Sequence, residues 1–459
     1  MRSYHLIYIL ALTAIIACQK PDIAETVANT PDEDVELGGK TTIQGSFINI
    51  FQQPAPNMSS AEFDLHREAD AAFGNKFVTA PSVNNSGLGP IFNQSSCESC
   101  HVSNGRSPFP TDPNELRGLL FRISSPGVDV HGEPLAVAGF GTQMQTKAVW
   151  GKQPEAHLSI SEINEIVAYA DGKTIALRKP VYNFIDTYIA LPANTQVSPR
   201  IASPMIGLGL LEAIDERDIT AFADPNDANG DGISGKPNSV WDVTAQAMRL
   251  GRFGWKAGQP TLLQQTAAAY SGDMGLTTSF FPTESSFGQL QYDNLNDDVE
   301  ISDALLYETT FYPQSLGVPA RRNYADADVQ RGKSLFLSMQ CGGCHRPSFV
   351  TGSHTKYPFL NQQKIFPYTD LLLHDMGDGL ADNRPDFAAT GKEWRTPPLW
   401  GIGLTRLVGN HTNFLHDGRA RSFEEAIMWH GGEAANSRAK FTQLSAADRT
   451  AVVRFLESL

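Results

Sequence analysis

Cysteine is scarce in this sequence: only five occur among 459 residues. Four of them stand in two short runs of the form C-x-x-C-H, and the fifth is Cys18 near the N-terminus. No cysteine is left for a structural disulfide, so a packed core has to hold the fold together. Core material is available, because 41% of the residues are hydrophobic and the length fits two or three domains.

Basic residues are also few. Lysine and arginine total 36 against 50 aspartates and glutamates, which gives a formal net charge of −14. Nucleic-acid binding needs a basic surface that meets the phosphates, so this balance excludes nucleic acid as a partner. The acidic balance would suit a positively charged electron donor, and it is also an ordinary aid to solubility.

The two C-x-x-C-H runs carry the signature of covalent c-type haem attachment. On a helix, both cysteines and the histidine of such a run fall on one face, as two thioether bonds and one axial iron ligand require. A redox-active or zinc-binding C-x-x-C is the alternative, and two copies that both end in histidine argue against it. We therefore predict two c-type haems, held by Cys97, Cys100, His101, Cys341, Cys344 and His345.

The N-terminus indicates export. A charged start at Arg2 is followed by an apolar run, residues 6–17, that is too short to span a bilayer. The residues up to Cys18 resemble a lipobox, which predicts a signal peptide over residues 1–17 and a lipid anchor on the Cys18 thiol; an ordinary secretory signal is the alternative. Gln19 after the cysteine is similar to lipoproteins sent to the outer membrane, on its periplasmic face or at the cell surface. Residues 18–58 then read as a flexible tether.

A phenylalanine precedes the first cysteine of each run by five residues, as Phe92 and Phe336. This indicates a degenerate internal repeat of two cytochrome c-like modules. The runs lie further apart than one module requires, so an insertion separates them. We expect an N-terminal haem domain over residues 59–324, which contains the insertion, and a C-terminal haem domain over residues 325–459.

The insertion is expected to be partly β. Residues 165–177 predict a hairpin that turns at Asp171-Gly172, and residues 119–123 and 181–185 are further strand candidates. Cap residues and apolar periodicity predict helices over residues 59–77, 203–214, 422–430 and 445–459. The predicted fold is therefore mainly α, with two cytochrome c-like haem modules and a partly β insertion in the N-terminal one.

Residues 227–233 resemble the first half of an EF-hand loop. Asp227, Asn229 and Asp231 offer side-chain oxygens at alternate positions, and a glycine follows for the turn. The glutamate that should close such a loop is absent, because Asn238 stands there. We favour a structural Ca²⁺ held partly by other segments, and a metal-free Asp/Asn/Gly turn is the alternative.

Longer motifs extend over nearly everything from residue 59 to residue 459. They include Leu88-Gly-Pro-Ile-Phe-Asn, Ser198-Pro-Arg, Gly207-Leu-Gly-Leu-Leu-Glu, Gly251-Arg-Phe-Gly-Trp-Lys-Ala, Leu372-Leu-His-Asp-Met-Gly, Glu393-Trp-Arg-Thr-Pro-Pro-Leu-Trp-Gly, Leu415-His-Asp-Gly-Arg and Trp429-His-Gly-Gly-Glu-Ala. In these motifs the chain resembles the bacterial di-haem oxidoreductases that are described as peroxidases. That family is more distantly similar to the di-haem cytochrome c peroxidases, in which an N-terminal haem reacts with H₂O₂ and a C-terminal haem supplies an electron.

The resemblance implies roles for three residues near the first haem. In the related peroxidases a tryptophan between the haems is followed ten residues later by a distal glutamine, and then by a distal glutamate that precedes methionine. Trp255, Gln265 and Asp273-Met274 follow that order, with an aspartate in place of the glutamate and two residues closer to the glutamine. Such a carboxyl can move the proton that peroxide cleavage requires. The alternatives are core packing for Trp255, a surface position for Gln265 and a helix cap for Asp273.

For the C-terminal haem, the same relationship places the sixth ligand fourteen residues after the histidine of the His-Asp-Gly run. Counting from His416 leads to His430, so bis-histidine ligation is expected, with Met376 or no side chain as alternatives. We interpret His416 and His374 as pocket contacts. His131 reads as a surface turn histidine or as a resting-state cap of the first haem.

Together these features predict an exported, lipid-anchored di-haem oxidoreductase that reduces H₂O₂ at the first haem. Electrons would come from an external donor such as a small cytochrome or cupredoxin, enter through the second haem and cross near Trp255. The alternatives are an oxidase or oxygenase that acts on another substrate, and a non-catalytic two-haem electron relay.

Overall fold

The computed structural model describes residues 33–295, 297–354 and 356–459. The expected signal peptide and Cys18 lie outside the described residues. The structure is 29% helical and 20% strand, a mixed α/β fold, so the prediction of a mainly α fold is wrong. The strand content exceeds the expectation because connections between helices pair into short ladders, in addition to the strands of the expected insertion.

Five helices in the described part of the chain have ten residues or more, and several others consist of a single turn. The helices are α2 Ser60–Gly74, α3 Cys97–Cys100, α4 Leu208–Glu212, α5 Glu216–Thr220, α6 Leu262–Met274, α7 Asp303–Ser315, α8 Ala327–Ser338, α9 Thr405–Gly409, α10 Phe423–Trp429, α11 Ala435–Gln443 and α12 Ala446–Ser458. No helix in the described part of the chain has both the length and the apolar character needed to cross a bilayer.

Local signals placed several helix ends correctly. Ser59 caps α2 and Ser445 caps α12, each by accepting a hydrogen bond from the backbone N–H three residues on, as predicted. Ser422 caps α10 in the same way, and this helix ends just before His430. The helix expected over residues 203–214 begins only at Leu208, because Gly207 adopts a left-handed conformation with φ 69° that an α-helix cannot include.

Strands β4, β3 and β8 form a three-stranded antiparallel sheet, and β6 and β7 form a long hairpin. The other strands pair two by two, as β1–β11, β2–β5, β9–β10, β12–β13 and β14–β15. The bounds are β1 Thr42–Ile43, β2 Ile91–Phe92, β3 Leu119–Ser124, β4 Gln143–Met144, β5 Lys147–Ala148, β6 His157–Ala168, β7 Thr174–Ile185, β8 Gln196–Ile201, β9 Ser239–Asp242, β10 Ala247–Leu250, β11 Val318–Pro319, β12 Phe349–Val350, β13 Lys364–Ile365, β14 Leu373–Asp375 and β15 Glu393–Arg395.

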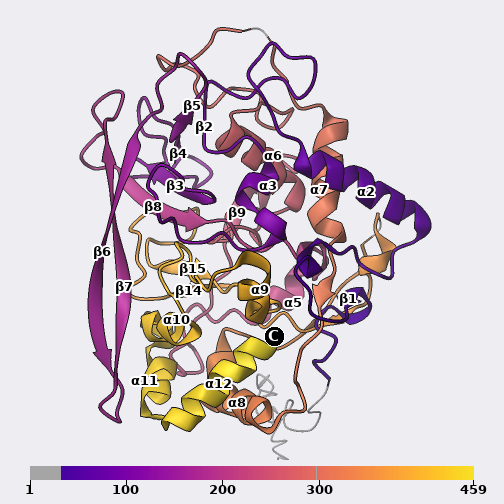
Figure 1. Cartoon of the computed structure of the whole chain (residues 1–459), viewed down its shortest axis with the longest axis vertical. Coiled ribbons are helices and arrows are strands. Elements are labelled where there is room, and N and C mark those ends of the chain that lie inside the picture. Colours follow the sequence, from indigo (N-terminus) through magenta and orange to yellow (C-terminus); the bar gives the residue numbers. More distant parts are fainter. Residues whose placement is uncertain (1–32, 296, 355) are drawn as a thin grey trace, which may run out of the picture.

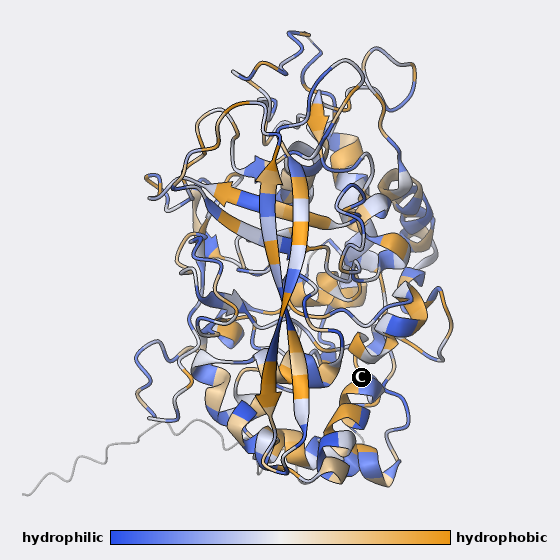
Figure 2. Cartoon of the chain, turned by 60° about the vertical axis from the view of Figure 1, so that its left-hand side comes forward, coloured by the Kyte–Doolittle hydropathy of each residue, from blue (hydrophilic) through white to orange (hydrophobic). Residues whose placement is uncertain are grey.

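The β6–β7 hairpin runs along one side of the molecule, from the region of β3, β4 and β8 above to that of α10 and α11 below (Figure 1). It turns at Asp171-Gly172, as predicted, and continues for twelve residues on each strand. Hydrophobic and hydrophilic residues alternate along much of it (Figure 2), because successive side chains point to opposite faces. Its tip is fixed to the C-terminal helices by an ion pair between Asp171 and Arg449 at 2.7 Å.

The three-stranded sheet separates the core from a polar space. Phe121 and Ile123 of β3 are buried in a hydrophobic cluster, and Phe121 meets the rings of Tyr182 and Phe184 of the hairpin edge-on. The alternate residues, such as Arg122, point to the opposite face. One face of the sheet therefore packs and the other is free to line a site.

Helices α8 and α12 cross at Gly332. A Cβ at position 332 would lie 1.9 Å from the carbonyl oxygen of Ala451, so only glycine permits this approach. The crossing brings Phe336 of α8 against Phe455 of α12, with ring centroids 5.2 Å apart, and Phe336 also lies beside the ring of His345. The C-terminal helix thus supports the second C-x-x-C-H run through α8.

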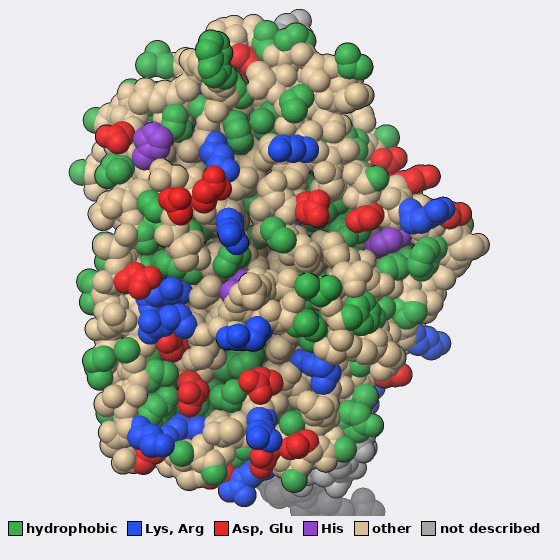
Figure 3. Space-filling model, viewed as in Figure 1, with side chains coloured by type: hydrophobic (Ala, Val, Ile, Leu, Met, Phe, Trp, Pro, Cys, Tyr) green, Lys and Arg blue, Asp and Glu red, His purple; other side chains and the backbone are tan. Residues whose placement is uncertain are grey.

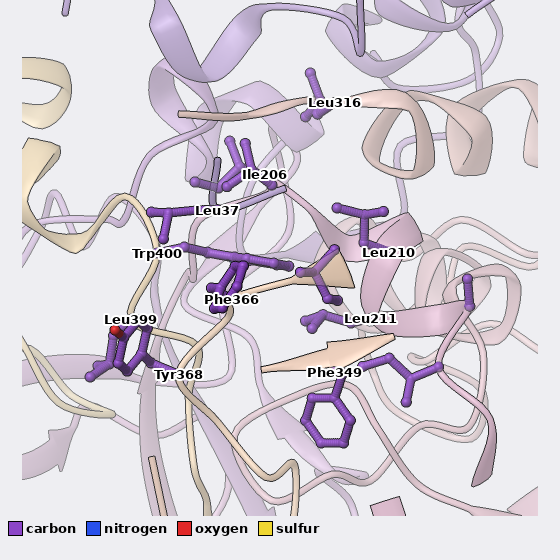
Figure 4. Packing of buried hydrophobic residues seen from close by; sticks show 14 of the residues in the cluster. Leu37, Ile206, Leu210, Leu211, Leu316, Phe349, Phe366, Tyr368, Leu399 and Trp400 are labelled. Atoms are coloured by element: carbon purple, nitrogen blue, oxygen red, sulfur yellow. The ribbon is translucent and has the colours of Figure 1, made fainter. Parts of the chain in front are cut away.

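Residues 33–58, expected to belong to a flexible tether, are folded into the largest hydrophobic cluster. Leu37, Ile50 and Phe51 are buried there, and β1 pairs in parallel with β11. Figure 4 shows Leu37 beside Ile206 and the flat ring of Trp400. A few buried apolar side chains are enough to order this otherwise polar segment. The average composition of residues 18–58 does not show these side chains, and so the segment was predicted to be flexible.

Asp34 ties the same segment to the second C-x-x-C-H run. Its buried carboxylate accepts hydrogen bonds from Arg321 at 2.6 Å and from the Tyr368 hydroxyl, and it forms an ion pair with Lys333 at 2.9 Å. Burial by itself would raise the pKa of Asp34. The two cations and the hydroxyl have a larger, opposite effect, so the pKa lies below the ordinary value. The backbone carbonyl of the same Tyr368 accepts the hydrogen bond of His345.

Replacing Asp34 by alanine should leave two buried cations without their partner and cost about 3–5 kcal/mol of stability. Chemical denaturation followed by tryptophan fluorescence measures the loss. Glu33→Gln is the control, because Glu33 makes a solvent-exposed pair with Lys364, at 2.5 Å. Equal midpoints for the alanine variant and the wild-type protein would show that this cluster does not stabilise the fold.

Candidate functional site

Each C-x-x-C-H run opens into its own cavity. The N-terminal cavity has a volume of about 290 Å³ and is lined by Cys97, Cys100 and His101. The C-terminal cavity has a volume of about 170 Å³ and is lined by Cys341, Cys344 and His345. The structure thus brings together all six residues predicted to hold the two haems, in two separate groups of three.

The histidines of both runs are oriented by backbone carbonyls. His101 Nδ1 lies 2.9 Å from the Ser203 carbonyl oxygen, and His345 Nδ1 lies 3.0 Å from that of Tyr368. A carbonyl only accepts, so Nδ1–H donates and Nε2 keeps its lone pair. Burial lowers the pKa of each histidine to about 4, which keeps the rings neutral, as a metal ligand requires.

The four cysteines of the runs are free thiols in the structure. Burial raises the pKa of Cys97 and of Cys341 to about 12, and it also raises the pKa of Cys100 and Cys344. A redox-active C-x-x-C needs a thiolate with a lowered pKa. This environment disfavours that alternative and is compatible with thioether formation.

Unpartnered polar atoms in the cavity walls fit a haem with its two propionates. Arg106 is 7% exposed and lines both cavities, yet its Nε and Nη1 atoms have no hydrogen-bond partner. Burial lowers the pKa of Arg106 to about 10, so the side chain stays charged at neutral pH. Buried guanidinium groups require an anion or an acceptor. The donor set of each cavity, two thiols and an imidazole beside this cation, therefore fits a c-type haem.

Helix α6 delivers two of the predicted residues to the N-terminal cavity. Gln265 and Asp273 line it together with Leu262, Thr266 and Ala269, which share one face of the helix. Gln143 of β4 donates a hydrogen bond from Nε2 to Asp273 Oδ1 at 2.8 Å. Burial raises the pKa of Asp273, and the Arg122 guanidinium and this hydrogen bond offset part of the rise. Neither a surface position for Gln265 nor a cap role for Asp273 describes what is observed.

Sequence reasoning missed the opposite wall of this cavity. Arg122 of β3 and Arg200 of β8 line it from the polar face of the three-stranded sheet, and Gln143 joins them through its contact with Asp273. Arg200 forms an ion pair with Asp386 at 2.9 Å. The signal that could have found Arg122 is the alternation of residues 119–124, in which an arginine stands at a position that faces away from the core.

Trp255 lies between the cavities and lines both of them. Its indole Nε1–H donates to the Ile201 carbonyl oxygen at 2.8 Å, and Arg106 lies 5.4 Å from the ring centroid. His416 lines the C-terminal cavity, meets Trp255 edge-on and stacks on Trp394 with centroids 3.9 Å apart. Aromatic side chains therefore lie between the two cavities.

The C-terminal cavity contains both candidates for a sixth ligand. His430 and Met376 line it together with His345, whereas Met428, on the same helix region as His430, is buried elsewhere. His430 Nδ1–H donates to the Ala426 carbonyl oxygen at 2.7 Å, which again leaves Nε2 available. Among the described residues that line the N-terminal cavity, His101 is the only histidine.

His374 is a pocket contact beside the second run. Its Nε2 lies 2.8 Å from Asp370 Oδ2 and its Nδ1 lies 2.7 Å from Glu433 Oε2, while Cys344 Sγ is 3.4 Å away. Burial opposes the charge on His374, but Asp370 and the other partners raise its pKa well above the ordinary value. His131 stacks on Trp241 with centroids 3.8 Å apart and lines neither cavity.

The 227–233 loop is built from its own hydrogen bonds. Asp227 accepts from the backbone N–H of Gly232, Asp231 accepts from that of Ile233, and Asn229 donates to Asp231 at 3.0 Å. Such contacts are typical of an Asx-type turn. The oxygens that accept these hydrogen bonds are the same ones that the sequence offers to a Ca²⁺.

The family model described as "Di-haem oxidoreductase, putative peroxidase" matches residues 33–459. The chain belongs to the di-haem oxidoreductases. No curated protein and no solved structure matches it. The match begins where the described structure begins, and it includes both cavities of this oxidoreductase.

Glu433 allows a pH test of the C-terminal site of the oxidoreductase. Burial raises its pKa, but the hydrogen bond and charge of His374 outweigh burial and bring the pKa down to about 2. A carboxyl whose pKa is lowered on folding stabilises the folded state fully when the pH is above its ordinary pKa of about 4.5. This stabilisation disappears as the pH falls through about 2. Glu433→Gln should therefore lower the stability by about 3 kcal/mol at pH 6 and by little at pH 2.5.

Urea denaturation at these two pH values measures that difference. Glu457→Gln, an exposed position on α12, is the matched control. A loss of stability that is equal at both pH values would contradict the assignment of the low pKa to Glu433.

Proposed function

We propose that this di-haem oxidoreductase reduces hydrogen peroxide in the N-terminal cavity with electrons that enter through the C-terminal haem. H₂O₂ takes up two electrons and two protons and yields two molecules of water. The observation that carries the proposal is the asymmetry of the two cavities. The N-terminal cavity is lined by one histidine, His101, and by an acid on α6. The C-terminal cavity is lined by four histidines, and His430 is the one available as a second ligand beside His345.

The proposed attachment is covalent at both sites. Cys97 and Cys100 would form the thioether bonds of the first haem, with His101 as axial ligand, and the second run would do the same for the second haem. A haem bound at the first site would supply an iron with one exchangeable coordination position. The orientation of the His101 imidazole by the Ser203 carbonyl supports this assignment.

The side chains of the N-terminal cavity would move the proton. Asp273 Oδ2 accepts no hydrogen bond from a described residue, so it would be able to take a proton from peroxide and to return it to the departing oxygen. Gln143 holds the other oxygen, Oδ1, in place. Gln265 lies on the same helix face and would orient the peroxide.

The C-terminal cavity would hold a closed, electron-feeding haem. We assign His430 as its sixth ligand and Met376 as the rival. Trp255, which borders both cavities, would lie on the electron path. The electron donor is proposed to be a small cytochrome or cupredoxin. On the face seen in Figure 3, basic and acidic side chains are interspersed, so the net charge does not by itself mark a docking area.

Export is a separate proposal that rests on the sequence alone. The apolar run, residues 6–17, and Cys18 would direct the protein out of the cytoplasm and attach a lipid, with the outer membrane as destination. Assembly of c-type haems outside the cytoplasm agrees with this route. Residues 33–58 belong to the fold, so they would not be part of a tether between lipid and fold.

Asp273→Ala should slow peroxide turnover by about 10²–10⁴-fold, the usual worth of acid–base catalysis. Stopped-flow and steady-state assays of the haem-loaded protein, with a reduced one-electron carrier, measure it. Asp64→Ala, on the exposed face of α2, is the control and should leave turnover unchanged. Low-spin, six-coordinate iron at both haems in every redox state, without turnover, would instead identify an electron relay.

His430→Met should raise the reduction potential of the second haem, because a thioether stabilises Fe(II) relative to imidazole. Potentiometric titration measures the shift, and near-infrared magnetic circular dichroism identifies the ligand. Met376→Leu is the matched control and should change neither signal. A methionine–iron band in the wild-type protein would refute ligation by His430.

A further inference from the structure

The N-terminal cavity contains a cation whose place is set by strand register. On β3, Arg122 is opposite Gln143 of β4 and Ser198 of β8. Side chains directly opposite each other in a sheet lie on the same face. Since Phe121 and Ile123 are buried in the core, Arg122 has to point to the other face, where it lines the cavity.

Arg122, like Arg106, has no hydrogen-bond or ion-pair partner of its own, in contrast to the other arginines that line this cavity. It makes no hydrogen bond or ion pair with any described residue. Arg252 donates to three backbone carbonyls, Arg395 donates to those of Gly254 and Thr396, and Arg200 is paired with Asp386. A charged guanidinium held inside a protein without a partner is costly, so such a group is retained where an anion or a developing negative charge meets it.

The group that faces Arg122 is Asp273. The guanidinium lowers the pKa of Asp273, and Asp273 is in turn the first of the charges that raise the pKa of Arg122. The two side chains approach from different elements: a Cβ on Gly272 of α6 would lie only 3.7 Å from Arg122 Nη1. Three further charges act on Arg122: Arg200 of β8, Asp386 of the loop before β15 and Glu133 of the loop before β4.

We propose that Arg122 is a further catalytic residue of the N-terminal cavity, where it stabilises the negative charge that develops on the departing oxygen of peroxide. This inference rests on the proposed function. Asp273 takes the proton from one oxygen, and the O–O bond breaks with its electron pair moving to the other oxygen. That oxygen receives the proton from Asp273 and leaves as water. The remaining oxygen becomes the second water with two electrons, one from each of two molecules of a reduced one-electron carrier, and two protons from solvent.

Arg122 and Asp273 divide the work of this step. Asp273 is neutral once it has taken the proton, so Arg122 is the charged member of this pair when negative charge develops on the departing oxygen. Arginine suits the task because it remains protonated when Asp273 changes its charge. A preorganised donor of this kind contributes about 10²–10³-fold to a rate.

The test uses haem-loaded Arg122→Gln and Arg122→Lys, with Arg249→Gln on the exposed face of β10 as the matched control. For Arg122→Gln, we expect kcat/KM for H₂O₂ to fall by about 10²–10³-fold. In the pH profile of kcat/KM, the decrease on the acid side should move to higher pH, since loss of the cation raises the pKa of Asp273. Arg122→Lys should recover part of the rate, and the control should match the wild-type protein.

Ligand binding to the ferric protein provides a readout that needs no turnover. Fluoride should bind at least about 10-fold more weakly to Arg122→Gln, which corresponds to about 1.4 kcal/mol. Neutral imidazole should bind equally to both proteins. Circular dichroism and thermal unfolding establish that each variant is folded, and Arg122→Lys keeps the test informative if the glutamine variant is not.

Three results decide the inference. Unchanged turnover and fluoride affinity in Arg122→Gln would overturn it. An altered reduction potential of the first haem with unchanged fluoride affinity would also overturn it, because Arg122 would then be a propionate contact. If the wild-type protein does not reduce peroxide, the proposed function fails, while loss of fluoride affinity in the variant still supports Arg122 as the group that stabilises an anion in this cavity.

Discussion

The hydrogen bond from each C-x-x-C-H histidine to a backbone carbonyl is the interaction on which the rest of the structure depends. Because Nδ1–H donates to Ser203 or to Tyr368, Nε2 of each ring is turned towards its cavity. Both carbonyls belong to segments far away in sequence. The residues that form the two cavities therefore have to be assembled by the whole fold before either histidine is correctly placed.

The supports of the two carbonyls differ. Tyr368 is held by Asp34, which comes from the first described residues, and its ring packs on Phe336 and Phe455. Ser203 follows β8 directly, so the sheet that presents Arg200 to the N-terminal cavity also places the carbonyl that orients His101. In the N-terminal cavity, the orientation of His101 and the position of Arg200 thus depend on one sheet.

Local sequence signals predicted elements well and their assembly poorly. Caps such as Ser59 and Ser445 and the Asp171-Gly172 turn are encoded within a few residues, and the structure agrees with them. The prediction of a mainly α fold was wrong because short strand pairs between distant segments leave no periodic pattern of hydrophobic residues in the sequence. Arg122 was missed for the same reason. Its position in the cavity wall depends on the pairing of β3 with two strands further along the chain, where Gln143 and Ser198 lie opposite it, 21 and 76 residues away.

The β6–β7 hairpin joins the two cavities in a way that the domain boundaries did not anticipate. Near its base it packs on the sheet beside the first cavity, through Phe121 and Tyr182. Further along, Arg178 donates to the carbonyls of Gly418 and Arg419, next to His416, and the tip contacts α11 and α12. A ribbon bound to both regions makes their loss of structure cooperative, because neither can open without breaking contacts of the other. The separation between the two haem sites would then stay constant for as long as the protein is folded.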